Sequence, residues 1–357
     1  MKKNKKILIV AGGSGGHIFP GITIAKYLNS KGWEVVWLGS DSGIESIIIP
    51  KQNIKYFFFR ILKINQKNFI NKVKSICYFI ASFFSCFFLV KKIKPKIVIG
   101  MGNYISVPGV FSAFIQNIPI FLQEQNIVIG RANFFLSYFA KKVFFGFPNH
   151  TYCNKKYKFI GNPIRKNLLN FVNPKKKYFH RNGRLKILVL GGSQGSKEVN
   201  EIFIKVARKL NKKIDIWHQV GYKNFQEMKN QYSLFQIKNY KISKFIKNIK
   251  IAYKWADLVI CRSGGITVSE IACIGIAAIF IPFSHKNQHQ YWNAKYLSDK
   301  GAAKIITDKY RAEKDIINTI LSLDRNKILS MSEIAKKMFI KNFLKNLLKE
   351  IQKYADR

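Results

Sequence analysis

Short apolar runs that end in glycine or proline recur along the chain, with stretches of helical spacing between them. In the first half these runs cover residues 7–11, 35–38, 97–102 and 119–122. A continuous apolar run of this length, closed by a turn, is typical of a strand buried on both faces of a parallel sheet. Helical spacing over residues 21–28 separates the first two runs. The alternation predicts an α/β fold with a doubly wound parallel sheet.

The opening pattern appears again in the second half. Residues 185–190 form an apolar run, a glycine turn follows at 191–195, and helical spacing begins at about Lys197. Further apolar runs lie at 214–218, 257–261 and 278–282. IVAGGSGG (9–16) and LVLGGSQG (188–195) therefore occupy equivalent places in two similar domains. Ligands of such sheets bind at the carboxyl ends of the strands, so we expect a cleft there between the domains.

Periodicity is lost in residues 162–184, which gather Pro, Asn, Gly and charge and are predicted to be a linker. The predicted organisation is a first domain over 1–161, a second domain over 185–335 and a C-terminal helix over 336–357 that can return to the first domain. The tail is expected to be helical and basic from 334 to 354. The length of 357 residues agrees with two domains, since a chain this long usually divides into more than one hydrophobic core.

Composition indicates a globular protein, because 48% of the residues are hydrophobic. The formal net charge of +44 favours contact with polyanions. However, the excess is mostly Lys and accompanies abundant Ile, Asn and Phe, which is also the pattern of AT-rich coding DNA. The five cysteines have no metal-ligand or C-x-x-C spacing and are predicted to be reduced in the cytosol; they are Cys77, Cys86, Cys153, Cys261 and Cys273. The first apolar run is too short for a signal peptide.

Residues 75–90, SICYFIASFFSCFFLV, form an apolar stretch between clusters of lysine. A membrane-spanning helix needs about 20 apolar residues, so this stretch is short for a span. Apolar side chains between basic ends suit a helix that lies in the headgroup region of an anionic membrane. A crossover helix packed on the sheet fits the same pattern. Both interpretations can be true of one helix, because one face can pack on the sheet while the other contacts the membrane.

The two glycine turns are candidate phosphate sites, because a turn that leads into a helix presents backbone N–H groups and the positive end of the helix dipole. Neither turn matches the P-loop pattern, and neither has the spaced G-x-G-x-x-G fingerprint. P-loop nucleotide hydrolysis and hydride transfer are therefore disfavoured. Glycines that only permit tight turns are the alternative explanation.

The segment CRSGGITVSEIACIG (261–275) combines a strand end, a glycine pair and the start of a helix. Thr267 and Ser269 can cap that helix, and Glu270 can accept hydrogen bonds from the two hydroxyls of a ribose. A nucleoside diphosphate site is predicted here, with a cap that binds no ligand as the alternative. In the following polar loop, 283–294, Gln290 and Asn293 offer the donors and acceptors that sugar hydroxyls require.

Seven segments stand out in order along the chain: GGSGGHIFP (12–20), GMGNYISVPG (100–109), EQN (124–126), GNPIR (161–165), GGSQGS (191–196), CRSGGITVSE (261–270) and HQYWNA (289–294). Together they resemble the bacterial glycosyltransferase family that adds N-acetylglucosamine (GlcNAc) to lipid-linked muramyl-pentapeptide. The resemblance implies a GT-B fold, with two Rossmann-like domains. It implies transfer from UDP-GlcNAc to the C4 hydroxyl of undecaprenyl-pyrophosphoryl-MurNAc-pentapeptide (lipid I), with inversion, to give lipid II and UDP. It implies no cofactor, no bound metal and a peripheral location on the cytoplasmic face of the inner membrane.

The resemblance places UDP-GlcNAc on the second domain. Arg165 and the backbone of Ile246 would border the uracil, and Glu270 would bind the ribose. Diphosphate contacts would come from Ser193 and from the helix start that comprises Gly265, Ile266, Thr267, Val268 and Ser269. Gln290 and Asn293 would bind the GlcNAc hydroxyls. Charge that develops on UDP would be stabilised by the helix N-terminus.

The first domain would hold the lipid acceptor, with Ser14, Gly15 and Gly16 near its diphosphate. These three residues and Asn126 are also expected to contribute to UDP-GlcNAc binding. His17 is the first candidate for the general base, because a neutral imidazole can accept the proton of the attacking hydroxyl. Glu124 is the second candidate, and such a carboxylate could instead orient His17 or a sugar.

Two positions depart from the family pattern: Gln123 stands where His is usual, and Gly265 where Ala is common. A proton relay through position 123 is therefore lost or was never needed. Another GT-B transferase or a UDP-GlcNAc 2-epimerase is the alternative with the same fold. A nucleic-acid-binding protein would account for the charge, but no RRM, KH or helix-turn-helix signature is present in the sequence and no nucleic-acid partner is expected.

Overall fold

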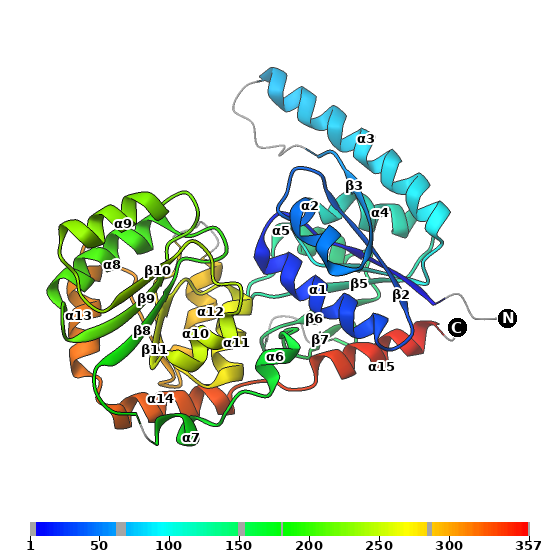
Figure 1. Cartoon of the computed structure of the whole chain (residues 1–357). Helices are drawn as coiled ribbons and strands as arrows, with labels where there is room; N and C mark the ends of the chain where they lie inside the picture. The colour runs from blue at the N-terminus through cyan, green and yellow to red at the C-terminus, as the bar shows by residue number, and fades with distance from the viewer. Residues whose placement is uncertain (1–4, 62–68, 149–153, 180, 284–287, 356–357) are drawn as a thin grey trace. The chain divides into compact units, whose positions relative to one another are not determined.

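The computed structural model describes residues 5–61, 69–148, 154–179, 181–283 and 288–355, without the side chains of 69–72. Cys153 and positions 284–287 of the predicted polar loop lie outside these residues. The chain forms two compact units (Figure 1). Unit 1 comprises Met1–Pro163 and Ile340–Arg357, and unit 2 comprises Ile164–Phe339.

Unit 1 is built on a parallel sheet of seven strands in the order β3-β2-β1-β4-β5-β6-β7. The inner strands are buried apolar runs, and Ile7 of β1 pairs with Val35 of β2 and Ile97 of β4. The elements are β1 (Lys6–Val10), α1 (Gly15–Asn29), β2 (Glu34–Ser40), α2 (Glu45–Ile48), η1 (Ile49–Gln52), β3 (Lys55–Phe59), α3 (Phe69–Ile93), β4 (Ile97–Gly100), α4 (Ser106–Ile115), β5 (Ile120–Glu124), α5 (Arg131–Ser137), β6 (Lys142–Phe145), β7 (Tyr157–Phe159) and α15 (Phe343–Ala355).

Alternate residues of β1 point to opposite faces of this sheet, as strand geometry requires. Ile7 and Ile9 contribute to a core with α1 and with Phe343, Leu347 and Ile351 of α15. Leu8 and Val10 belong to a second core, which α3, α4 and α5 cover. The last helix of the chain therefore completes the core of unit 1 (Figure 1).

Unit 2 repeats the arrangement with six parallel strands in the order β10-β9-β8-β11-β12-β13. Counted within the unit, this is the 3-2-1-4-5-6 order of a Rossmann fold. The elements are α6 (Lys166–Leu169), α7 (Pro174–Tyr178), β8 (Leu185–Leu190), α8 (Lys197–Lys209), β9 (Ile214–Gln219), α9 (Phe225–Leu234), β10 (Tyr240–Ser243), α10 (Ile249–Trp255), β11 (Leu258–Cys261), α11 (Gly265–Ile274), β12 (Ala277–Phe280), α12 (His289–Ser298), β13 (Ala303–Ile305), α13 (Ala312–Ser322) and α14 (Arg325–Lys337).

Three segments differ from the sequence-based expectation. Helix α1 begins at Gly15, directly after the glycine turn, and not at residue 21. Residues 162–184 were expected to be a linker, but they carry α6 and α7 and belong to unit 2 from Ile164 onward. The predicted helical tail is two helices, because α14 ends at Lys337 and α15 begins at Phe343.

Helix α3 contains the apolar stretch 75–90 and is longer than that stretch, since flanking residues join it. Two of its serines face the protein: Ser75 and Ser82 are buried, and the Ser82 hydroxyl donates to the carbonyl of Arg60. Ser85 is exposed. Large apolar side chains also lie exposed, at Ile76, Ile80, Phe84 and Phe88. Among the described helices, this one is long and apolar enough to cross a bilayer, although the core helix of a soluble protein can meet the same criterion.

Candidate functional site

The first glycine turn follows β1 and leads into α1. Gly13 has φ +90°, a conformation that favours glycine. Ser14 is the extended N-cap residue of α1, and its carbonyl accepts from the N–H of His17 and of Ile18. Gly15 and Gly16 therefore lie in the first turn of the helix, where backbone N–H groups have no intrahelical acceptor. The turn has the geometry of an anion site.

His17 is half-buried in the first turn of α1. Its Nδ1 lies 3.0 Å from the Ser14 hydroxyl oxygen. Desolvation lowers the pKa of His17 to about 4. The imidazole is therefore neutral at neutral pH, which is the form that can accept a proton.

Glu124, at the end of β5, is buried and accepts four hydrogen bonds. Its Oε1 accepts from the backbone N–H and the side-chain amide of Asn126, at 3.0 and 3.1 Å. Its Oε2 accepts from the Gly130 N–H at 3.0 Å and from the Asn133 amide at 2.9 Å. These four hydrogen bonds fix the loop after β5, so the geometry gives Glu124 a structural role.

Gln123 and Asn162 meet beneath that loop, where the Gln123 amide donates to Asn162 Oδ1 at 3.1 Å. The amide of Asn162 donates in turn to the carbonyl of Gln125 at 3.0 Å. Gln123 thus has a structural role in the position where the family pattern has His.

The second glycine turn follows β8 in unit 2, with Gly192 and Gly195 at positive φ. Gln219, at the end of β9, donates to the Gly192 carbonyl at 2.9 Å. Its Oε1 accepts from the Ile246 N–H at 2.8 Å. One side chain therefore ties the glycine turn to the backbone expected at the uracil. Ser193, the predicted diphosphate ligand, is half-buried in the turn.

Helix α11 follows β11 and begins at Gly265, the second residue of the glycine pair. Gly264 is its N-cap residue, so Thr267 and Ser269 do not occupy the capping position that was expected of them. Thr267 lies half-buried in the first turn, and Val268 and Ser269 are buried. The positive end of the helix dipole at the start of α11 suits an anionic ligand.

Glu270 is buried on α11 between two partners. Its Oε1 lies 3.2 Å from Arg165 Nε, and its Oε2 accepts from the Tyr253 hydroxyl at 3.2 Å. Burial raises the pKa of Glu270, while the Arg165 charge and the Tyr253 hydrogen bond act in the opposite direction. The structure thus brings together Arg165 and Glu270, two residues predicted for the same ligand.

Gln290 and Asn293 lie on α12, and not in a loop as predicted. Gln290 is half-buried, and its Oε1 accepts from the Phe283 N–H at 2.9 Å. Asn293 is fully buried, and its amide donates to the Ser263 carbonyl at 3.2 Å. A fixed helix start therefore positions both amides.

Sequence reasoning missed the side chains that fix the predicted site residues from other elements. In unit 2, Gln219 bonds to the Gly192 carbonyl and Tyr253 to Glu270. The Arg262 guanidinium donates to Ser196 Oγ at 2.9 Å, directly after the second glycine turn. In unit 1 such side chains are Glu45 and Asn103. These residues lie near the carboxyl ends of strands or in neighbouring helices. No sequence motif marks their contacts, because the segments in contact are far apart in the sequence.

Two Rossmann-type units with glycine turns at equivalent strand ends define the GT-B class of glycosyltransferase fold. The chain matches the glycosyltransferase family 28 N-terminal domain over residues 7–145 and the C-terminal domain of the same family over 186–350. It belongs to glycosyltransferase family 28.

Curated relatives cover nearly the whole chain. One is the UDP-N-acetylglucosamine–N-acetylmuramyl-(pentapeptide) pyrophosphoryl-undecaprenol N-acetylglucosamine transferase of Wigglesworthia glossinidia brevipalpis, 45% identical over 98% of each chain. The enzyme of the same name from Baumannia cicadellinicola is 43% identical over 93% of this chain and 92% of its own length.

Solved structures agree with this assignment. MurG of Acinetobacter baumannii has a TM-score of 0.80 and 31% identity, covering 98% of this chain and 99% of that one. The UDP-GlcNAc 2-epimerase of Neisseria meningitidis bound to UDP-GlcNAc has a TM-score of 0.66 over 98% of this chain and 100% of its own. At 14% identity it shares the fold alone.

Proposed function

We propose that this chain transfers GlcNAc from UDP-GlcNAc to the C4 hydroxyl of lipid I, with inversion, giving lipid II and UDP for peptidoglycan synthesis. The observation that carries the proposal is the identity of 45% over 98% of the chain with a transferase of that name. The pairing of Arg165 with Glu270, on the helix that follows the glycine pair, supports a sugar nucleotide as donor.

The donor site proposed in unit 2 uses backbone groups for charge and side chains for hydroxyls. N–H groups at the start of α11, with Ser193, would bind the diphosphate and stabilise the negative charge that develops on UDP. Glu270 would accept hydrogen bonds from the ribose hydroxyls. At the uracil, the Ile246 N–H is bonded to Gln219, so recognition there would use the Ile246 carbonyl. Gln290 would contact GlcNAc, and buried Asn293 would hold the helix start that presents it.

The acceptor site proposed in unit 1 uses the first glycine turn, with Ser14, Gly15 and Gly16 near the lipid diphosphate and Asn126 beside the sugars. We favour His17 over Glu124 as the base, since four hydrogen bonds occupy the Glu124 carboxylate. If Nδ1–H of His17 donates to Ser14 Oγ, then Nε2 has a lone pair that can take the proton of the C4 hydroxyl. The hydroxyl oxygen then attacks the anomeric carbon, and UDP leaves.

The exposed apolar face of α3 is proposed to dock on the cytoplasmic surface of the inner membrane. Ile76, Ile80, Phe84 and Phe88 are four residues apart and form one stripe along the helix. Phe83 of α3 contacts Phe111 of α4, which contacts Phe135 of α5, so aromatic side chains connect the three helices. Exposed basic residues lie toward both ends of α3, at Lys74, Lys91, Lys92 and Lys94. Apolar insertion with a basic border suits anionic lipid.

Membrane docking is tested by co-sedimentation with vesicles. Wild type is expected to bind vesicles that contain phosphatidylglycerol, and Phe84→Glu should reduce that binding. Leu234→Glu is the matched control, because Leu234 is an exposed apolar residue on a helix of unit 2. Equal loss in both variants would reject α3 as the docking face.

The reaction is tested with radiolabelled UDP-GlcNAc, offered with the lipid-linked acceptor or with a soluble acceptor. Label should enter the lipid fraction only when the lipid-linked acceptor is present, and one UDP should form for each sugar transferred. Epimerised sugar or a labelled soluble product, without labelled lipid, would exclude the proposed reaction.

A further inference from the structure

A buried carboxylate lies behind the first glycine turn. Glu45, the first residue of α2, has no exposed surface. Its two oxygens lie 3.2 and 3.1 Å from the Gly13 N, and Oε1 also accepts from the Ser40 N–H at 3.2 Å. Within the described residues no Lys, Arg or His forms an ion pair with it. Backbone N–H groups are thus the partners of this charge.

Asn103 holds the same turn from another strand. It follows β4, and its amide donates to the Gly12 carbonyl at 3.4 Å. Its Oδ1 accepts from the Tyr104 N–H at 2.7 Å, which fixes the side chain. The peptide between Gly12 and Gly13 is therefore bonded at both ends, its N–H to Glu45 and its carbonyl to Asn103.

The two glycines are required by these contacts. A Cβ on Gly12 would collide with Glu45 Oε1, and one on Gly13 would collide with Asn103 Nδ2. Glu45 and Asn103 can therefore come this close to the turn only because Gly12 and Gly13 have no side chain. Because α1 starts two residues beyond Gly13, the orientation of this peptide sets the direction of the following N–H groups and of His17.

We propose that Glu45 and Asn103 are positioning residues for catalysis, which orient the Gly12–Gly13 peptide and so align the turn with the acceptor diphosphate and the base. The inference rests on the proposed acceptor role of this turn. Neither side chain needs to touch the substrate. The negative charge of Glu45 behind an anion site would by itself weaken binding of the diphosphate. We therefore assign Glu45 a geometric role, in which its oxygens accept the hydrogen bond of the Gly13 N–H.

Glu45→Gln tests the inference, because it keeps the size of the side chain but introduces an N–H₂ group among N–H donors. We expect kcat/KM for the lipid acceptor to fall at least 10-fold, with KM for UDP-GlcNAc changed less than 2-fold. Glu34→Gln is the matched control: Glu34 is an exposed glutamate on β2, and the substitution removes the same charge from the same unit. Glu45→Asp, which restores the carboxylate, should recover part of the loss.

Asn103→Gly provides the second arm, since glycine tolerates the positive φ of 70° at this position and lacks the amide. It should lower kcat/KM for the lipid acceptor while KM for UDP-GlcNAc changes little. This variant tests the positioning role even if Glu45→Gln does not fold. A lower KM for the lipid acceptor in Glu45→Gln would show that the Glu45 charge only repels the acceptor. An effect equal to that of Glu34→Gln would show that Glu45 does not position the turn. Either result would overturn this inference and leave the proposed function standing. A wild type that transfers no GlcNAc to lipid overturns the proposed function and this inference together.

Discussion

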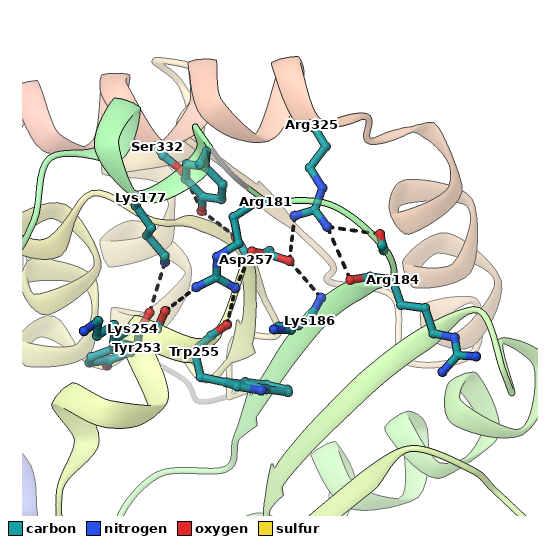
Figure 2. Close-up of polar contacts among 12 residues, drawn as sticks. Lys177, Arg181, Arg184, Lys186, Tyr253, Lys254, Trp255, Asp257, Arg325 and Ser332 are labelled. Atoms are coloured by element: carbon teal, nitrogen blue, oxygen red, sulfur yellow. Dashed lines mark hydrogen bonds and ion pairs between the residues drawn. The ribbon is translucent and has the colours of Figure 1, made fainter.

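Lys177 is a buried lysine whose titration should be measurable in the stability of the protein. It lies on α7 with 8% of its surface exposed, and its Nζ donates to the Tyr253 carbonyl at 3.0 Å (Figure 2). Its pKa is lowered to about 7, chiefly by burial; the nearby Arg181 charge acts in the same direction, and Asp257 acts in the opposite direction. The Asp257 carboxylate is already engaged by Arg181 and Arg325, at 3.1 and 2.7 Å.

The sign of the pH effect follows from proton binding. In the unfolded chain the lysine has its ordinary pKa of 10.5, so between pH 7 and 10.5 the unfolded state holds one proton more than the native state. The free energy of unfolding therefore rises with pH across this window, at up to about 1.36 kcal/mol per pH unit. Because Lys177 is half titrated at pH 7, the gain from pH 7 to pH 9 is about 2 kcal/mol.

Lys177→Met removes the titrating group and keeps an apolar chain of similar length. Urea unfolding of wild type and variant, followed by tryptophan fluorescence at pH 7 and pH 9, gives the difference between their free energies of unfolding. That difference should shift by about 2 kcal/mol in favour of wild type at pH 9. Lys175→Met is the control, since Lys175 is an exposed lysine on the same helix. A pH-independent difference between wild type and Lys177→Met would refute the reasoning.

Three further predictions concern the proposed site. Glu270→Ala should weaken UDP binding about 10- to 100-fold in calorimetry, because hydrogen bonds to a charged group are lost, while unfolding stays cooperative; unchanged affinity would reject the ribose role. Tyr253→Phe should weaken UDP binding about 5-fold by releasing Glu270 Oε2, and Tyr296→Phe, which removes a hydroxyl bonded to a backbone carbonyl, serves as control. His17→Ala should lower kcat far more than donor affinity. With a pKa of about 4, wild-type His17 is deprotonated above that pH, so it should cause no decline in kcat/KM between pH 8 and 5; near-normal turnover of the variant would move the base to Glu124.

The central strands were predictable from the sequence because they are buried on both faces and leave continuous apolar runs. The predicted run 185–190 is the observed β8, and 7–11 differs from β1 by one residue at each end. The edge strands β3, β7, β10 and β13 were not predicted, because they are partly exposed and short or mixed in composition. The inner strand β6 was also not predicted, since its apolar run is only three residues long. The start of α1 was placed too late, because glycine and Pro20 within its first turns obscure the helical pattern.

The candidate site was predictable where its residues follow one another in a motif. The glycine turns and Glu270 were found in this way. Arg165 was assigned to the same ligand only by the family resemblance, and its contact with Glu270 comes from the structure. The inward-facing serines of α3 were not predicted as such, since the hydroxyl of Ser82 finds its acceptor in a distant segment, at the Arg60 carbonyl. The same holds for Tyr253, whose partner Glu270 lies 17 positions away on another helix.

Side chains from the two flanking strands fix both glycine turns, although the residues differ. In unit 1 the turn follows β1, and its backbone is held by Glu45 after β2 and by Asn103 after β4, the two strands that flank β1. In unit 2 the turn follows β8, which β9 and β11 flank. Gln219 of β9 bonds to the Gly192 carbonyl, and Arg262 after β11 bonds to the hydroxyl of Ser196, the residue after the turn.

This correspondence has a physical cause in the topology. At the switch point of a doubly wound sheet, connections leave the central strands toward opposite faces, so no helix covers the turn that meets the ligand. Its backbone must then be held from the ends of the flanking strands. Any side chain that reaches the turn and offers the required donor or acceptor can do so, which is why a carboxylate and an amide serve in unit 1, and an amide and a guanidinium in unit 2. The position in the sheet is therefore a better guide to such residues than their identity.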